Sequence, residues 1–113
     1  MHEMSIALNI VELAMDYAKK ENAQSIRQID IDVGSLSGVL TDSLSFCFEA
    51  ATKNTLAENA TLAINSIPAK GECNNCNHQW NVEQLPCNCP KCGDYFVRLL
   101  AGKELQVKSI TIN

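Results

Sequence analysis

Cys73-Asn74-Asn75-Cys76 and Cys89-Pro90-Lys91-Cys92 are two matched cysteine pairs with twelve residues between them. Two turns of this form can bring four thiolates around one Zn²⁺ ion, which prefers soft ligands in a tetrahedron. Asn77 follows the first pair and Gly93 the second, and Asn and Gly best tolerate the positive φ that a metal-binding turn requires. The pattern predicts a structural zinc site with these ligands: Cys73, Cys76, Cys89 and Cys92.

Two neighbouring side chains leave alternatives for the ligand set. Cys87 lies two residues before Cys89, and His78 lies two residues after Cys76. Cys87 could replace a favoured cysteine, and His78 could be an alternate ligand or a side chain that contacts one of the ligands. We prefer Cys89 and Cys92, because they repeat the spacing of the first pair and precede a glycine, and we expect His78 to be a solvated surface residue. A redox-active pair or a disulfide is the other interpretation, but redox motifs of this form usually occur singly at a helix N-terminus.

Charge and composition exclude several classes of function. The formal charge of the 113-residue chain is −4, and a zinc ion held by four thiolates takes it to about −6. A nucleic-acid-binding surface needs clustered basic side chains, whereas the nine Lys and Arg residues here are scattered. We expect no nucleic-acid partner, and keep a zinc-ribbon adaptor or nucleic-acid module as the alternative function. No apolar run approaches the ~18 residues of a membrane span.

The same reasoning addresses location. We expect no signal peptide, because no charged segment followed by an apolar one opens the chain. Six cysteines without a secretory signal favour a reducing compartment and metal ligation over disulfides. We therefore predict a cytoplasmic protein with no membrane partner.

Hydrophobic spacing predicts two helices. In the first, over about residues 5–21, apolar residues recur every three or four positions: Ile6, Ile10, Leu13 and Tyr17. Asn22 should end it. For the second helix we predict Thr41 as the N-cap, with Asp42 favourably placed in the first turn. Its apolar positions have the same spacing: Leu44, Cys47, Phe48 and Ala51.

Alternation and turn residues predict the strands and the fold. Residues 29–33 alternate strictly, residues 61–67 read as a strand stopped by Pro68, and residues 95–100 and 105–112 read as strands broken near Gly102. The order predicts an α+β fold in which two helices pack on a small mixed or antiparallel sheet. A zinc-ribbon-like tetracysteine segment interrupts it. We predict one discontinuous domain of residues 1–68 and 94–113, and a zinc-binding domain of residues 69–93.

The N-terminal Met1-His2-Glu3 is a second candidate metal site. The amine of Met1, the amide nitrogen of His2 and the imidazole of His2 can chelate one ion in adjacent five- and six-membered rings. Such nitrogen-rich ligation suits square-planar Ni²⁺ or Cu²⁺. The fourth ligand stays open: Glu3 could supply its amide or its carboxylate, and Asp42 is a less favoured source.

Several motifs together resemble one family in order and over essentially the whole chain. They are Met1-His2-Glu3, the apolar first helix, Gly34-Ser35-Leu36-Ser37-Gly38-Val39, Phe46-Cys47-Phe48-Glu49 and the paired cysteines. This set is similar to the HypA/HybF family, the nickel metallochaperones of hydrogenase maturation. The resemblance implies that Ni²⁺ binds at Met1, His2 and Glu3, with the side chain of His2 indispensable. It also implies that the discontinuous domain carries the nickel and the inserted one the zinc.

The resemblance further implies partners: a nickel-handling maturation GTPase and a hydrogenase large subunit, with urease maturation in some members. We leave the oligomeric state open, a homodimer included. The residues do not support an enzyme. There is no Gly-rich phosphate loop, and with only two histidines no nucleophile–histidine set can be assembled. A redox enzyme is the least favoured alternative, and Cys47 is expected to belong to the core of the second helix.

Overall fold

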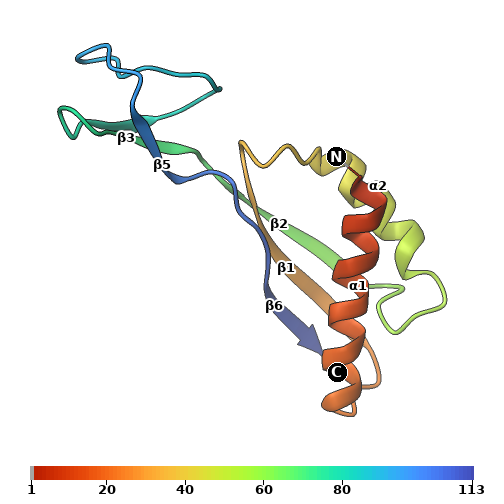
Figure 1. Ribbon diagram of the computed structural model, residues 1–113. Coiled ribbons are helices and arrows are strands. Elements are labelled where there is room, and N and C mark those ends of the chain that lie inside the picture. Colours follow the sequence, from red (N-terminus) through yellow and green to blue (C-terminus); the bar gives the residue numbers. More distant parts are fainter. Residues whose placement is uncertain (1) are drawn as a thin grey trace. The chain divides into compact units, whose positions relative to one another are not determined.

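The computed structural model describes residues 2–113. Its elements run in this order: α1 (Glu3–Lys20), β1 (Ile26–Gly34), α2 (Thr41–Thr52), β2 (Thr61–Ile67), β3 (Lys70–Cys73), β4 (Gln79–Asn81), β5 (Val97–Ala101) and β6 (Leu105–Ile112) (Figure 1). The chain divides into two compact units. We call residues 2–32, 39–65 and 106–113 the helical unit, and residues 33–38 and 66–105 the cysteine unit.

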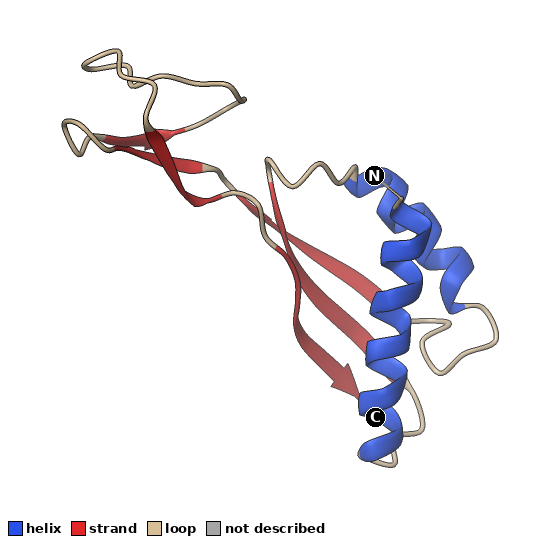
Figure 2. Ribbon diagram, in the orientation of Figure 1, coloured by secondary structure: helices blue, strands red, loops and turns tan. Residues whose placement is uncertain are grey.

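The helical unit is an α+β layer structure, as predicted. Its three-stranded sheet has the order β2-β1-β6, and both helices lie on one side of it (Figure 2). The central strand β1 supplies much of the core, since Ile29 and Ile31 are fully buried. Asp32 on the same strand is also buried, and its two carboxylate oxygens accept hydrogen bonds from the side chains of Asn65 (3.3 Å) and Gln106 (3.5 Å). These bonds satisfy the buried carboxylate and tie β1 to both neighbouring strands.

Helix α1 buries a different face from the one that hydrophobic spacing predicts. Leu13 and Tyr17 are 51% and 42% exposed. The buried face is instead built mainly of small residues: Ala7, Ile10, Val11, Ala14 and Ala18. Alanine side chains let a helix approach its neighbours closely. The face of α1 with the smaller side chains is therefore the one that packs against the rest of the unit. Only Ile10 belongs to both the predicted and the observed buried sets.

The C-terminus of α1 ends as the sequence predicts, at Asn22. Asn22 has a φ of 54°. Its N–H donates to the carbonyl of Lys19 (3.2 Å), and the N–H of Ala23 donates to the carbonyl of Ala18 (2.9 Å). This pair of bonds is the Schellman arrangement, which satisfies carbonyls that the helix leaves free and terminates it.

Helix α2 begins one residue earlier than predicted. Thr41 is its first helical residue, and the N-cap is Leu40, whose backbone is extended (φ −85°, ψ 108°) and makes no side-chain cap. The carbonyl of Leu40 accepts the first helical hydrogen bond, from the N–H of Leu44 (2.9 Å). Of the predicted apolar stripe, Leu44 and Phe48 are buried, whereas Cys47 is half-buried.

The cysteine unit has a three-stranded antiparallel sheet with the order β4-β3-β5. Two of these strands, β3 and β4, lie in the segment that the sequence predicted as a zinc loop, and they are too short for alternation to reveal. Strand β5 begins at Val97, two residues later than predicted. It pairs with β3 through Gly71↔Leu99 and Cys73↔Val97, so the residues after the second cysteine pair belong to the same sheet as the first pair.

Three backbone segments of the cysteine unit cross closely at Gly34, Gly102 and Ala69. A Cβ placed on Gly34 would lie 2.1 Å from the carbonyl oxygen of Gly102. A Cβ placed on Gly102 (φ +121°) would lie 2.5 Å from the Cβ of Ala69. Hydrogen bonds fasten the crossing: the N–H of Leu36 donates to the carbonyl of Gly102 (2.7 Å), and the N–H of Ala69 donates to Ser35 Oγ (3.1 Å). No side chain fits at either glycine, which explains why both positions lack one.

Candidate metal sites

The structure brings the four predicted zinc ligands together. The sulfur atoms of Cys73, Cys76, Cys89 and Cys92 all lie within 4.8 Å of one another. Cys73 Sγ is 3.5 Å from Cys92 Sγ, and Cys76 Sγ is 3.6 Å from Cys89 Sγ. Four sulfurs at ~2.3 Å from a tetrahedral zinc ion are separated by about 3.8 Å. The cluster therefore has the size and donor type of a tetrathiolate zinc site.

Each cysteine pair forms the same local turn. Cys73 Sγ accepts the N–H groups of Asn75 (3.3 Å) and Cys76 (3.5 Å). Equivalently, Cys89 Sγ accepts those of Lys91 (3.4 Å) and Cys92 (3.4 Å). These donors stabilise negative charge on sulfur, which a metal-bound thiolate requires.

The turns close at the residues with positive φ that the sequence indicated. Asn77 has a φ of 62° and Gly93 a φ of 82°. The N–H of Asn77 donates to the carbonyl of Cys73 (2.9 Å), and that of Gly93 to the carbonyl of Cys89 (2.8 Å). Both turns therefore point their amides at the first sulfur of the pair because the chain bends back at a residue that tolerates this conformation.

The thiols differ in how readily they lose a proton. Burial alone raises the pKa of Cys89, but hydrogen bonds from the backbone N–H groups of Cys92 and Lys91, then from the thiols of Cys76 and Cys92, lower it to about 6. The backbone N–H of His78 lowers the pKa of Cys76, yet desolvation and its bonds to the three other thiols outweigh this and raise it to about 11. A bound dication would favour the ionised form of the sulfurs around it.

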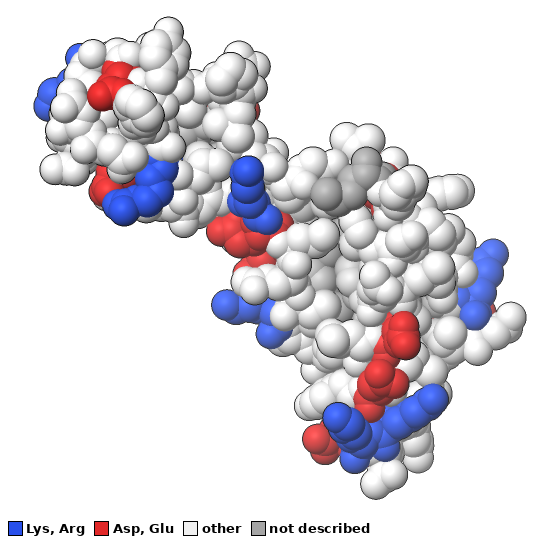
Figure 3. All heavy atoms as spheres, in the orientation of Figure 1, with Lys and Arg blue, Asp and Glu red and all other residues white. Residues whose placement is uncertain are grey.

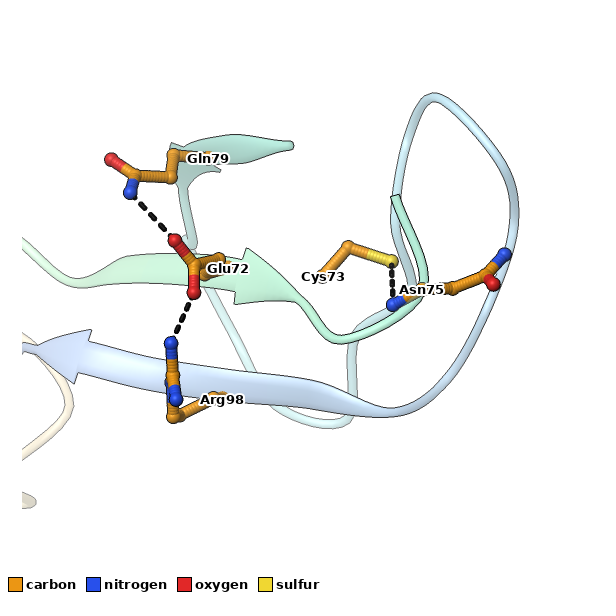
Figure 4. Close-up of polar contacts among 5 residues, drawn as sticks. All are labelled: Glu72, Cys73, Asn75, Gln79 and Arg98. Carbon is orange, nitrogen blue, oxygen red and sulfur yellow. Dashed lines mark hydrogen bonds and ion pairs between the residues drawn. The ribbon is translucent and has the colours of Figure 1, made fainter. Parts of the chain in front are cut away.

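A polar row spans the sheet directly beside the first cysteine. Glu72 pairs with Gln79 on β4 and with Arg98 on β5. Its carboxylate accepts a hydrogen bond from the Gln79 amide (2.8 Å) and forms an ion pair with Arg98 (Figure 4). These partners, Gln79 first, hold the pKa of the Glu72 carboxyl below its ordinary value. The row joins β3, which ends at Cys73, to β4 and β5, which follow the first and second cysteine pairs. It was not predicted from the sequence because β3 and β4 were not predicted.

Cys87 and His78 do not join the cluster of four sulfurs. Cys87 is half-buried. The ring of His78 stacks on that of Trp80, with centroids 5.8 Å apart and planes 9° from parallel. His78 is therefore a half-buried aromatic contact, not the solvated side chain that we expected.

The N-terminal candidate ligands lie at the start of α1. His2 is the N-cap of this helix, and its carbonyl accepts the N–H of Ile6 (3.2 Å); its side chain is exposed. Glu3 is the first helical residue, and its carboxylate accepts a hydrogen bond from the backbone N–H of Leu40 (3.2 Å). That bond lowers the pKa of the Glu3 carboxyl. Because the donor is a backbone group, no sequence pattern could have revealed it.

Of the other predicted nickel-site residues, Met1 lies outside the described residues. Asp42 is exposed in the first turn of α2. Over residues 2–113 the one grouping of three or more His, Cys, Asp or Glu ligand atoms is the cysteine cluster, so His2, Glu3 and Asp42 are not assembled around a common point.

The face drawn in Figure 3 agrees with the scattered charges of the sequence. On the face drawn in Figure 3, Lys and Arg side chains alternate with Asp and Glu, and no broad basic area forms. Within residues 2–113, neither helix combines the length and apolar character that crossing a membrane requires.

A family model described as "Hydrogenase/urease nickel incorporation, metallochaperone, hypA" matches residues 1–112. The chain belongs to the HypA family. It is 45% identical to the hydrogenase maturation factor HypA of Geobacter sulfurreducens, and 44% identical to that of Chlorobaculum tepidum, each over 99% of both chains. The solution structure of the nickel metallochaperone HypA from Helicobacter pylori aligns with a TM-score of 0.68 at 26% identity, over 99% of this chain and 97% of that one. A second HypA solution structure aligns at 0.74 and 25%, covering 100% and 97%.

Membership of the HypA family confirms the resemblance seen in the sequence and the predicted α+β fold with a tetracysteine cluster. The protein is thus a metallochaperone of nickel incorporation in hydrogenase maturation.

Proposed function

We propose that this HypA-family protein binds one Ni²⁺ ion at Met1, His2 and Glu3 and delivers it to a nickel–iron hydrogenase during maturation. The observation that carries this proposal is the position of His2. It caps α1 through its carbonyl while its imidazole stays exposed. The imidazole that a chelate needs is therefore exposed to solvent, and the helix holds the residue in a defined direction.

The chemistry of these donors suits a carrier. An amine, an amide nitrogen and an imidazole favour Ni²⁺ over the oxygen-seeking Mg²⁺ and Mn²⁺. Only one of them is a side-chain ring, and the site lies at the surface, so a client protein can compete for the ion. The protein itself is then a binding and transfer factor, not a catalyst.

The cysteine cluster serves the second metal. Zn²⁺ held by Cys73, Cys76, Cys89 and Cys92 has no open coordination position, so its role is structural. The division proposed from the sequence, a nickel-binding domain of residues 1–68 with 94–113 and a zinc-binding domain of residues 69–93, assigns one metal to each part. The cysteine unit of the structure is wider than this zinc-binding domain, since it also takes in residues 33–38, 66–68 and 94–105.

The partners follow from the role. We propose a nickel-handling GTPase that supplies nucleotide hydrolysis, a hydrogenase large subunit as the recipient, and a cytoplasmic location where thiolates stay reduced. Urease is a further candidate client, and a homodimer is one way to present two nickel sites.

Nickel titration by calorimetry on zinc-loaded protein tests the proposal. Wild type should bind about one Ni²⁺ per chain, and His2→Ala should lose this binding while zinc content and circular dichroism are unchanged. One residue added before Met1 should be nearly as damaging, because the amine becomes an internal amide. The matched control is His78→Ala, which removes the other histidine and should bind nickel normally. Wild-type binding in both His2→Ala and the extended chain would refute the site.

A further inference from the structure

The carboxylate of Glu3 already has a partner. It accepts the N–H of Leu40 (3.2 Å), a residue 37 positions later in the chain. Leu40 is the N-cap of α2, so its own N–H lies outside the hydrogen-bond ladder of that helix. The N-terminal tripeptide supplies the acceptor for this N–H.

The charge of Glu3 is matched to this position. Glu3 lies in the first turn of α1 and touches the residue that starts α2. Each helix N-terminus carries about half a positive elementary charge. Two such ends would repel a cation bound nearby, and one carboxylate between them offsets that repulsion. A carboxylate that moved onto the metal would leave the N-terminus of α1 without the one acidic side chain of its first turn, whereas Asp42 would remain in the first turn of α2.

The bond also orders the residues that would hold nickel. The end of a helix frays unless something ties it down. Here the bond to Leu40 links the first turn of α1 to a second helix, directly after His2. Ordering a residue costs backbone entropy, so a site that is held in place before the ion arrives binds it more tightly.

We infer that Glu3 is a positioning residue of the nickel site: its carboxylate stays on the Leu40 N–H and fixes His2, and it does not ligate the ion. This inference rests on the proposed function, because it assumes that nickel binds at the N-terminus. If Glu3 contributes a ligand atom to the ion, that atom is then its backbone amide nitrogen and not a carboxylate oxygen.

The chain offers a way to remove the bond from either side. Glu3→Ala removes the acceptor. Leu40→Pro removes the donor without touching the tripeptide, and the φ of Leu40, −85°, is close to the value that proline imposes. Leu40 is 66% exposed, so Leu40→Ala, which keeps the N–H, is the matched control.

Nickel titrations on the zinc-loaded full chain should separate the roles. Glu3→Ala and Leu40→Pro should each weaken nickel binding by about tenfold, the double variant should be no weaker than either, and Leu40→Ala should match wild type. At saturating nickel, the visible absorption band of Glu3→Ala should keep its wild-type position, because the ligand set is unchanged.

Other outcomes overturn the inference. If Leu40→Pro binds nickel as well as wild type while Glu3→Ala is impaired and its absorption band shifts, the carboxylate is a ligand. Additive losses in the double variant would mean that the two residues act independently, and unchanged affinity in both would remove any role for the bond. His2→Ala in the same series tests the proposed function separately: if that variant binds nickel normally, the site is elsewhere.

Discussion

At the scale of single residues, the two cysteine turns show how much chemistry a short motif can specify. Cys73 and Cys89 are buried and each collects two backbone N–H groups, whereas Cys76 and Cys92 are exposed. The first cysteine of each pair thus lies deeper and accepts two backbone N–H groups, and the second closes the site from outside.

Removing one sulfur should therefore empty the site. We expect Cys73→Ala to lose zinc or bind it far more weakly, because three thiolates leave the tetrahedron open. Cys87→Ala should keep one zinc per chain, since its sulfur is outside the cluster. Metal content of the purified variants, measured by mass spectrometry, checks both. Zinc lost from Cys87→Ala but kept by Cys89→Ala would show that the ligand set is wrong.

At the scale of elements, α1 illustrates how small residues determine helix packing. Ala7, Ala14 and Ala18 are fully buried, whereas the larger Leu13 is half exposed. The backbone of α1 lies close to its neighbours at this interface, so little space is left for a larger side chain. Enlarging a side chain there should therefore lower the free energy of unfolding more than truncating one on the outer face.

Ala14→Leu should destabilise the protein by about 1–3 kcal/mol, because the added atoms have no space. The comparison variant is Leu13→Ala, on the neighbouring position, which we expect to change stability by less than about 1 kcal/mol. Urea denaturation followed by the helical circular dichroism signal measures both. A larger loss for Leu13→Ala would place the packed face where hydrophobic spacing alone had put it.

The same element explains which parts of the fold are predictable from sequence. Strands β2 and β6 have the bounds that apolar pattern and turn residues predict, and the end of α1 follows from the tolerance of Asn22 for positive φ. The cysteine cluster was predictable because ligand type and spacing are local. The buried face of α1, the short strands β3 and β4, and the Glu3–Leu40 bond were not, since each depends on what the rest of the chain places opposite.

At the scale of the whole molecule, the helices and the cluster of four cysteines belong to different compact units. The helical unit buries its own core, with Ile29, Ile31 and Leu44 fully enclosed. In the cysteine unit, by contrast, two of the fully buried side chains are Cys73 and Cys89, so the proposed metal would take the place that apolar side chains fill elsewhere.

Zinc removal should therefore affect one unit far more than the other. After treatment with a strong chelator under reducing conditions, we expect the amide signals of residues 70–101 to lose dispersion, whereas the helical circular dichroism signal stays nearly unchanged. Nuclear magnetic resonance of the same sample with zinc restored is the control. Loss of the helical signal together with the metal would mean that the two units fold as one.

The crossing at Ala69 and Gly102 has a consequence for how such a protein can be altered. The chain enters β3 just after Ala69 and leaves β5 just before Gly102, and these two backbone positions are neighbours in space. The segment between them therefore begins and ends at one place. A segment whose two ends are neighbours can be deleted and bridged by a linker of only one or two glycines, or replaced by the corresponding segment of a relative. Chimeric proteins that carry residues 70–101 of a relative would then show which part of the chain selects the client enzyme. The enzyme that each chimera helps to mature would identify that part as the exchanged segment or as the remainder of the chain.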